Sequence, residues 1–248
     1  MSQAPKSDSC IVERMRHYIE IDEKNELLLR DLEKEEVSYK SRVKLHLQEQ
    51  PSNLYVLKKG WLYRYVDLPD GKRQVLRVHY PGDIVGLTDV AMESTIGDTL
   101  TASDVVLCPF PKKNLDVIFT ESPRLTALIF SLGMLEEAIL LDRITMIARS
   151  SAVNRVANYI LEIHSRLRTH TDDATFSSFE LLLTQEVIAD ALGLTNVSVS
   201  NAFTQLEFEG KIIRNRKVVT LLDPDKLKQE LHFKDRYFKI DTSWFPKE

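Results

Sequence analysis

The fold is decided by residues 184–213, which read TQEVIADALGLTNVSVSNAFTQLEFEGKII. The spacing predicts two short helices that meet at Gly193, because glycine accepts at a corner a backbone conformation that side chains resist. Thr184 and Thr195 are placed to cap the starts of the two helices. Apolar residues recur on one face of each helix and predict a shared core, made of Val187, Ile188, Ala191, Leu192, Leu194, Val199, Ala202, Phe203 and Leu206.

The opposite face of the second helix is almost entirely uncharged and polar. It carries Asn196, Val197, Ser198, Ser200, Asn201 and Gln205. Neutral donors and acceptors suit the edges of bases, and hydroxyls suit phosphates, so this face predicts a DNA-recognition helix. Thr184 and Gln185, at the start of the first helix, complete this candidate set. The alternative is an ordinary helical hairpin with a polar outer face.

A basic hairpin follows the second helix directly. Residues 210–221 read GKIIRNRKVVTL, in which two runs of β-forming residues flank a polar tip. Arg214, Arg216 and Lys217 would lie beside the helix and bind the phosphate backbone, which adds affinity without sequence information. A solvated turn is the alternative for the tip alone. Together with the helix pair, the hairpin favours a winged helix-turn-helix.

Size and composition bound the class of protein. The chain has 248 residues, 43% hydrophobic and 28% charged, which is enough for two domains with cores of their own. No apolar run approaches the ~20 residues of a membrane span, and the start, MSQAPKSD, lacks a signal-peptide core. We therefore expect a cytoplasmic protein without a membrane partner. The net charge of −4 argues against indiscriminate coating of nucleic acid but allows a local DNA-binding face.

The first half of the chain changes from helical to strand-like patterns. Residues 11–35 are predicted to be helical, and residues 37–110 form short runs of β-forming residues separated by turns at 68–72 and 80–83. Many short strands interrupted by Gly and Pro predict a small barrel or sandwich. The strand pattern alone identifies no ligand.

A long helix follows, and Ser122-Pro123 is a strong start signal for it. Spacings of three and four along this helix form a heptad seam that predicts a coiled-coil dimer, made of Leu125, Leu128, Leu132, Leu135, Ile139, Asp142 and Met146. A neighbouring apolar stripe would pack on the β-domain, namely Ile129, Leu140, Leu141, Ile144 and Ile147. Burial of the whole helix within one chain is the alternative. Arg143 or Arg149 is a candidate partner of Asp142, and solvation at the helix end is the alternative. Ser150-Ser151 is the expected hinge before another helix that ends near Leu167.

In this order the elements resemble the Crp/Fnr family of bacterial transcription regulators, over roughly residues 20 to 222. The matching motifs are LYVLKKG at 54–60, DGKRQ at 70–74, PGDIVG at 81–86 and LGLT at 192–195. The resemblance implies an α+β fold with a jelly-roll-like barrel sensor domain at 1–121, a dimerisation helix at 122–149 and a winged helix-turn-helix at 150–222. It also implies a homodimer that binds a pseudo-palindromic site in double-stranded DNA and contacts RNA polymerase. Residues 223–248 form an extension with Tyr237, Phe238, Trp244 and Phe245, which packs back onto the chain or touches a partner.

The resemblance fails where members of the family bind cyclic nucleotides. Those members use a glutamate for the ribose and an Arg-Ser or Arg-Thr pair for the phosphate. Here Leu87 stands in place of the glutamate, and residues 96–99 read IGDT. Between Arg77 and Lys112 the sequence has no Lys or Arg, whereas it has five carboxylates, Asp83, Asp89, Glu93, Asp98 and Asp104. A buried phosphate without a counter-charge is strongly disfavoured, so we expect no cyclic AMP binding by the usual route.

Other cofactors of the family have little support in the residues. The cysteine ligands of an iron–sulfur cluster are absent, since the chain has only Cys10 and Cys108, which also rules out a four-cysteine zinc site. A thiol redox switch remains an alternative to two buried thiols. Haem bound through His46 or His79 stays open, although lone histidines on strands are usually structural. We therefore expect no cofactor and no metal, and the effector stays unassigned.

The recognition helix also departs from the family pattern. Many members have Glu where Val197 stands and Arg where Asn201 stands, beside a retained Ser200. Asn pairs with adenine rather than guanine, and Val197 can contact a thymine methyl, so we expect an operator richer in A·T. A metal-dependent enzyme would need clustered ligands that this barrel lacks, and no catalytic triad is present, so an enzyme is not expected. A nucleotide- or haem-regulated signalling module is the alternative function.

Overall fold

The computed structural model describes residues 8–47, 52–171, 173 and 175–247. The start MSQAPKS, residues 1–7, lies outside the described residues. The chain divides into two compact units. The first unit contains the residues up to Arg64, Val78–Met134 and the residues from Ile240, and the second contains Tyr65–Arg77 and Leu135–Lys239. Among the described helices, none combines the length and the apolar character that a membrane span requires.

The β-domain consists of two four-stranded antiparallel sheets, as the short-strand pattern predicted. One sheet has the order β1-β8-β3-β6, with β1 at Val37–Tyr39, β8 at Val105–Pro111, β3 at Asn53–Lys59 and β6 at Ile84–Val85. The other has the order β2-β7-β4-β5, with β2 at Lys44–Leu45, β7 at Asp98–Thr101, β4 at Leu62–Asp67 and β5 at Arg73–His79. A short 3-10 helix at Leu87–Asp89 follows β6. The strands β1, β2 and β7 fall in the stretch for which the sequence predicted strands without placing them.

Both sheets contribute side chains to one apolar core. The core cluster takes Tyr55, Leu57, Val85, Val105 and Leu107 from the first sheet and Leu45 and Leu62 from the second. Leu57, Leu62, Val85 and Leu107 have no exposed surface at all. Burying apolar area from both sheets holds them face to face, as in a sandwich.

Two glycines explain why the motifs LYVLKKG and PGDIVG contain glycine where they do. Gly60 has φ +78°, and a Cβ there would lie 2.1 Å from the carbonyl oxygen of Asp104. Gly82 has φ +81°, and its Cβ would lie 2.8 Å from the carbonyl oxygen of Cys10. Both positions therefore require glycine for its backbone conformation and for the close approach of a neighbouring backbone.

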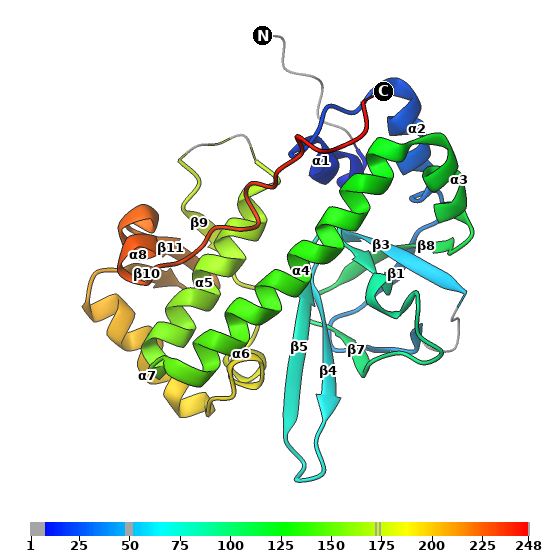
Figure 1. Cartoon of the computed structure of the whole chain (residues 1–248). Coiled ribbons are helices and arrows are strands. Elements are labelled where there is room, and N and C mark those ends of the chain that lie inside the picture. Colours follow the sequence, from blue (N-terminus) through cyan, green and yellow to red (C-terminus); the bar gives the residue numbers. More distant parts are fainter. Residues whose placement is uncertain (1–7, 48–51, 172, 174, 248) are drawn as a thin grey trace. The chain divides into compact units, whose positions relative to one another are not determined.

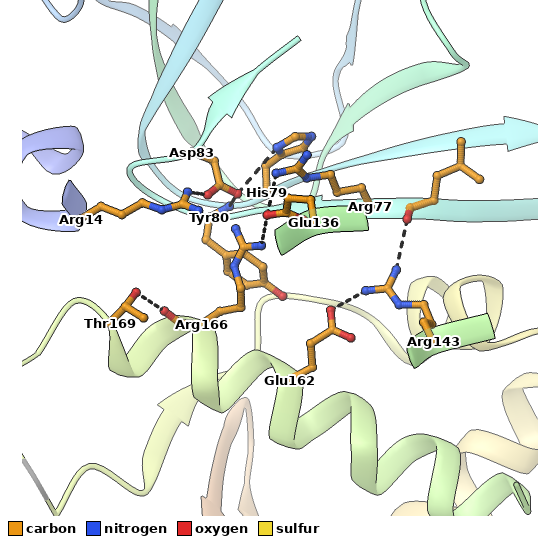
Figure 2. Close-up of polar contacts among 11 residues, drawn as sticks. Arg14, Arg77, His79, Tyr80, Asp83, Glu136, Arg143, Glu162, Arg166 and Thr169 are labelled. Carbon is orange, nitrogen blue, oxygen red and sulfur yellow. Dashed lines mark hydrogen bonds and ion pairs between the residues drawn. The ribbon is translucent and has the colours of Figure 1, made fainter. Parts of the chain in front are cut away.

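The N-terminal helical segment is two helices, whereas the sequence predicted one over residues 11–35. α1 spans Cys10–Arg16 and α2 spans Glu23–Asp31, and Asp22 caps α2 by accepting from the Asn25 amide at 2.7 Å. This cap starts a new helix, which the apolar periodicity did not reveal. α1 is held to the β-domain by a buried ion pair between Arg14 and Asp83 (Figure 2).

α3 spans Asn114–Glu121, and α4 is one long helix at Pro123–Arg149 (Figure 1). The Ser122 hydroxyl accepts from the Leu125 amide at 3.2 Å, so the predicted start signal is confirmed. The predicted dimer seam requires correction, because the single chain covers most of it. Leu125, Leu128, Leu132, Leu135 and Ile139 are each at most 9% exposed, Met146 is half-buried and Asp142 is exposed.

The exposed apolar face of α4 shares three residues with the neighbouring stripe that the sequence predicted. Its members are Phe130, Met134, Leu140, Leu141 and Ile144, which are 45% to 63% exposed. The sequence had assigned Leu140, Leu141 and Ile144 to packing on the β-domain, together with Ile129, which is buried, and Ile147, which is half-buried. Two adjacent apolar stripes have the same spacing, so periodicity could not tell which one the chain covers.

The second unit contains a winged helix-turn-helix. Its elements are α5 at Ala152–Arg168, β9 at Ser178–Glu180, α6 at Gln185–Leu192, α7 at Asn196–Phe208, β10 at Ile212–Asn215, β11 at Val218–Leu221 and α8 at Pro224–Glu230. Ser151 caps α5, which buries Val156, Ile160 and Ile163, while Val153 is only half-buried. The wing is the antiparallel pair β10–β11, and β11 also pairs with β9, a strand that the sequence did not predict.

Within the second unit, the residues after α8 pack back onto α4 and α5. Tyr237 is 3% exposed, with the Arg166 guanidinium 4.6 Å from its ring centre. Asp235 pairs with Arg168 at 3.2 Å and with Lys228 at 3.0 Å. Arg236 pairs with Asp142, so Asp142 has a partner that is neither Arg143 nor Arg149. Of the two roles predicted for the extension, packing onto its own chain is what these residues do.

Candidate nucleic-acid interface

The helix pair α6 and α7 has the caps and the corner that the sequence predicted. The Thr184 hydroxyl accepts from the Val187 amide at 3.3 Å, and the Thr195 hydroxyl accepts from the Ser198 amide at 3.1 Å. Gly193 has φ +61°, and a Cβ there would meet nothing within 4 Å. Glycine is therefore favoured at this corner by its backbone conformation and not by crowding.

The core of the helix pair also follows the prediction, with one difference. Val187, Ile188, Ala191 and Leu192 of α6 and Val199, Ala202, Phe203 and Leu206 of α7 are all buried. Leu194 was predicted to fill the core below the corner, but it is only half-buried. Its amide instead closes the turn by donating to the Ala189 carbonyl at 3.0 Å.

The outer face of α7 presents the predicted polar residues. Asn196, Val197, Asn201 and Gln205 are exposed, and Ser198 and Ser200 are half-buried. Among the described residues, no hydrogen bond or ion pair engages the side-chain amides of Asn196 and Asn201, so both can bind a ligand without breaking a contact. Val197 is 68% exposed, so its methyl groups can contact a ligand.

Other members of the candidate set already have partners. The Ser198 and Thr195 hydroxyls lie 2.9 Å apart, and Gln205 donates to Glu209 at 2.8 Å. Thr184 is exposed and Gln185 is half-buried. On the outer face, Asn196 and Asn201 are therefore unengaged, whereas Ser198 and Gln205 already have partners.

The tip of the wing is basic and exposed. Arg216 and Lys217 connect β10 to β11, and both are exposed, with side chains that have no hydrogen bond or ion pair among the described residues. Arg216 has φ +55°, in the left-handed region that residues other than glycine seldom adopt. This conformation allows the two strands to join through a tight turn.

Arg214 behaves differently from the tip. Its guanidinium donates to the Glu207 carboxylate at 2.6 Å, and its backbone amide donates to the same carboxylate at 3.2 Å. The guanidinium also lies 4.5 Å from the ring centre of Phe203. The Arg214 hydrogen bond lowers the pKa of Glu207. The structure thus joins Arg214 to α7, a role that its place in a basic stretch did not reveal; Glu207 was absent from the predicted set.

Two family models match this arrangement. Residues 154–230 match the Crp-like helix-turn-helix domain, and residues 36–122 match the cyclic nucleotide-binding domain. The nitrogen fixation regulation protein FixK of Bradyrhizobium diazoefficiens is 31% identical over 176 residues, which are 71% of this chain and 73% of that protein. The chain belongs to the Crp/Fnr family. This Crp/Fnr chain is also 28% identical to the transcriptional activatory protein AadR of Rhodopseudomonas palustris, over 72% of this chain and 73% of that protein.

Solved structures share the fold of this Crp/Fnr chain. FixK2 from Bradyrhizobium japonicum superposes with a TM-score of 0.67 at 23% identity, over 79% of this chain and 96% of that one. A CooA variant from Carboxydothermus hydrogenoformans gives 0.64 at 22% identity, over 91% of this chain and 97% of that one. The relatives are transcription regulators and not enzymes, and the mixed α+β fold with a β sensor-like domain and a C-terminal helix-turn-helix is confirmed.

The cyclic nucleotide-binding domain of this Crp/Fnr chain contains a cavity of about 330 Å³. Arg64 from β4 lies in its wall and forms a two-pronged ion pair with Asp89, with N–O distances of 2.8 Å and 2.6 Å. Both side chains are at least nine-tenths buried. Arg64 also donates to the Thr88 hydroxyl at 3.1 Å.

The residues of this cavity do not fit a cyclic nucleotide phosphate. The sequence prediction considered the cations between Arg77 and Lys112, and it missed Arg64, which comes from an earlier strand. The lining has two cations, Arg64 and Lys112, and two carboxylates, Asp89 and Glu93. The guanidinium charge is already neutralised by Asp89, so an entering phosphate would meet no excess positive charge.

The lone histidines and the cysteines occupy separate environments. His79 is 3% exposed and lies 3.7 Å from the Asp83 carboxylate, whereas His46 is exposed. No group of three or more potential metal ligands gathers within the described part of the chain. Burial raises the pKa of Cys10 to about 11 and that of Cys108 to about 12, so both thiols stay protonated at neutral pH.

Proposed function

We propose that this chain is a sequence-specific regulator that reads double-stranded DNA through the outer face of α7. The observation that carries the proposal is the pair of unengaged, exposed amides of Asn196 and Asn201 on a capped helix beside a basic wing tip. Amide side chains pair with adenine N6 and N7, and Val197 offers a methyl contact for thymine. Arg216 and Lys217 would bind phosphates, and Thr184 and Gln185 would bind the backbone at the start of α6.

The operator expected from these residues is richer in A·T than the usual site of the family. Asn201 replaces an arginine that many relatives carry, and an asparagine cannot reach guanine in the same bidentate way. Selection of bound sequences from a random pool tests this directly. Recovery of the usual family half-site would refute the changed operator, and no enrichment of any sequence would refute specific binding.

We infer a homodimer formed by the exposed face of α4. Phe130, Met134, Leu141 and Ile144 are separated by steps of four, seven and three, which places them on one seam of a heptad repeat. They are 48% to 63% exposed in the single chain, and a second copy would remove this apolar surface from water. Two recognition helices in one dimer would then match a pseudo-palindromic site.

The regulator is proposed to act without cyclic AMP by the usual route and without an iron–sulfur cluster. The Arg64–Asp89 pair supports the first point, because the cation that a phosphate would need already has a carboxylate partner. The proposal that no iron–sulfur cluster is bound rests on the cysteine count, because the sequence has only two cysteines and such a cluster needs four ligands. Calorimetry with cyclic AMP is expected to show no binding, and micromolar affinity would overturn this part of the proposal. A haem- or nucleotide-regulated module remains the alternative, which an absorption spectrum of fresh protein and native mass spectrometry would reveal.

A gel shift at several salt concentrations, combined with light scattering, tests the main proposal. A dimer that binds a selected duplex much more tightly than a scrambled one is expected, with affinity that falls as salt rises. A monomer without preference for any duplex would refute it. Contact with RNA polymerase is part of the proposal and is tested by transcription from a promoter that contains the selected site.

A further inference from the structure

A second cavity, of about 330 Å³, lies wholly within the second unit. Its walls come from the C-terminal half of α4, from α5 and from residues 231–237, which follow α8. It is separate from the cavity of the β-domain, with which it shares no residue. At about 30 Å³ for each water-sized group, it has room for a small organic molecule of roughly ten such groups.

The inner wall of this cavity is polar and fixed in place. Arg143 on α4 pairs with Glu162 on α5, and its guanidinium also donates to the Leu76 carbonyl at 3.1 Å (Figure 2). The side chains of Arg143 and Glu162 are largely buried, with 9% and 13% of their surface exposed. The Nε of Arg143 is buried and has no acceptor among the described residues, so one donor of this wall is unsatisfied.

The rest of the lining combines five apolar or aromatic residues with Thr145, Ser150 and Asn158. Ile139 and Tyr237 are buried, and Met146, Leu231 and Phe233 are half-buried. Apolar walls with a few polar groups are typical of small-molecule sites. The cavity thus suits a ligand with an apolar body.

The mouth of the cavity has an excess of positive charge. Arg149 and Lys234 line the cavity and are exposed, and among the described residues neither side chain has a hydrogen bond or an ion pair. The two carboxylates of the lining are both engaged, Asp142 by Arg236 and Glu162 by Arg143. His232 lines the same cavity in the left-handed conformation, with φ +50°. Two unpaired cations beside an apolar interior attract an organic anion.

We propose that this cavity is a binding site for a small organic carboxylate with an apolar body. The carboxylate lies between Arg149 and Lys234, and the body lies against Ile139, Met146 and Phe233. Binding requires neither DNA nor a dimer, so the site is tested on the free protein and its failure is distinguishable from failure of the proposed function.

The test is fluorine NMR of the full chain with three carboxylates of increasing length: para-fluorobenzoate, para-fluorophenylacetate and para-fluorohydrocinnamate. Saturable broadening is expected for at least one of them. Arg149→Glu and Lys234→Glu should each weaken binding by about tenfold or more, since tenfold corresponds to about 1.4 kcal/mol. Lys226→Glu is the matched control, because Lys226 is an exposed lysine outside the lining, and it should bind like the wild type.

Two further arms make the result decisive. The neutral amide of the best carboxylate should bind at least about tenfold more weakly. Met146→Trp, which fills the cavity, should abolish binding while circular dichroism and the melting temperature show that the variant is folded. No saturable binding of any of the three carboxylates overturns the proposal. Equal binding of the amide, or unchanged binding in both charge-reversal variants, overturns it as well.

Discussion

The guanidinium of Arg214 donates a hydrogen bond of 2.6 Å to the carboxylate of Glu207, which joins the wing strand β10 to the outer helix α7. Arg214 was predicted from the sequence to bind phosphate together with Arg216 and Lys217. Its contact with Glu207 gives it a second candidate role, which is to hold the wing in register with α7. The two roles predict a different dependence of DNA affinity on salt concentration when Arg214 is replaced.

Arg214→Ala and Glu207→Ala are expected to destabilise the second unit by similar amounts, with a coupling energy of about 0.5–1 kcal/mol between them. Urea unfolding of both single variants and the double variant measures this coupling. If Arg214 mainly positions the wing, Arg214→Ala keeps the salt slope of DNA binding. A slope lowered by about one would identify Arg214 as a phosphate ligand instead.

The proposed base and phosphate contacts differ in their effect on specificity. Asn201→Ala should cost about 1–3 kcal/mol at one base position and leave other positions unchanged. Arg216→Asn should weaken binding to all sequences and reduce the salt slope by about one, and asparagine tolerates the left-handed conformation of that residue. Binding titrations with single-base operator variants at several salt concentrations separate the two. Equal losses for every sequence in Asn201→Ala would contradict a base contact.

A single charged substitution tests the dimer seam proposed on the exposed face of α4. Ile144→Glu should give a monomer in light scattering, because two carboxylates would be buried at the dimer axis. Leu27→Glu on α2 is the control, since Leu27 is 64% exposed and Ile144 is 63% exposed, yet only Ile144 lies on the seam. A dimer that survives Ile144→Glu and Leu141→Glu alike would place the interface elsewhere.

The buried pair in the cavity of the β-domain should dominate the response to mutation there. Asp89→Ala leaves the Arg64 guanidinium buried without its partner and should cost about 3–5 kcal/mol of unfolding free energy. The double variant Arg64→Met, Asp89→Ala removes both charges and should recover most of that loss. Unfolding of the three proteins in urea is the measurement. Equal stability of the single and double variants would show that the unpaired Arg64 charge does not cause the loss of stability in Asp89→Ala.

His164 should make stability depend on pH near neutrality. It is 1% exposed, its Nε2 donates to the Phe176 carbonyl at 2.8 Å, and its buried Nδ1 has no partner among the described residues. Burial lowers the pKa of His164 below the ordinary value of 6.5. The unfolded chain therefore binds a proton that the folded chain does not, so stability is present above pH 6.5 and falls as pH drops below it.

The comparison protein for this prediction is His164→Gln, which can still donate to Phe176 but does not titrate. It should be less stable than the wild type at about pH 7.5, and the difference should shrink by about pH 5.5. Melting temperatures across this range provide the measurement. A difference that stays constant with pH would show that His164 does not titrate in this window.

Local signals of the sequence determined most elements of this protein, although they missed β9 and the break between α1 and α2. The hydroxyls of Thr184, Thr195 and Ser122 and the glycine at position 193 mark helix ends through contacts within a few residues, so they can be predicted without the fold. The apolar faces of α6 and α7 follow from helical periodicity for the same reason. The winged helix-turn-helix and the β-domain were therefore predictable.

Tertiary structure decided which surfaces are covered and which charges meet. Arg64 and Asp89 are 25 residues apart and Asp142 and Arg236 are 94 apart, so neither pairing appears in any local pattern. The two apolar stripes of α4 have the same period, and only packing shows that Leu128 is buried while Ile144 is exposed. The cavity between α4, α5 and the C-terminal extension also depends on tertiary structure, because its residues come together only when distant segments fold against one another.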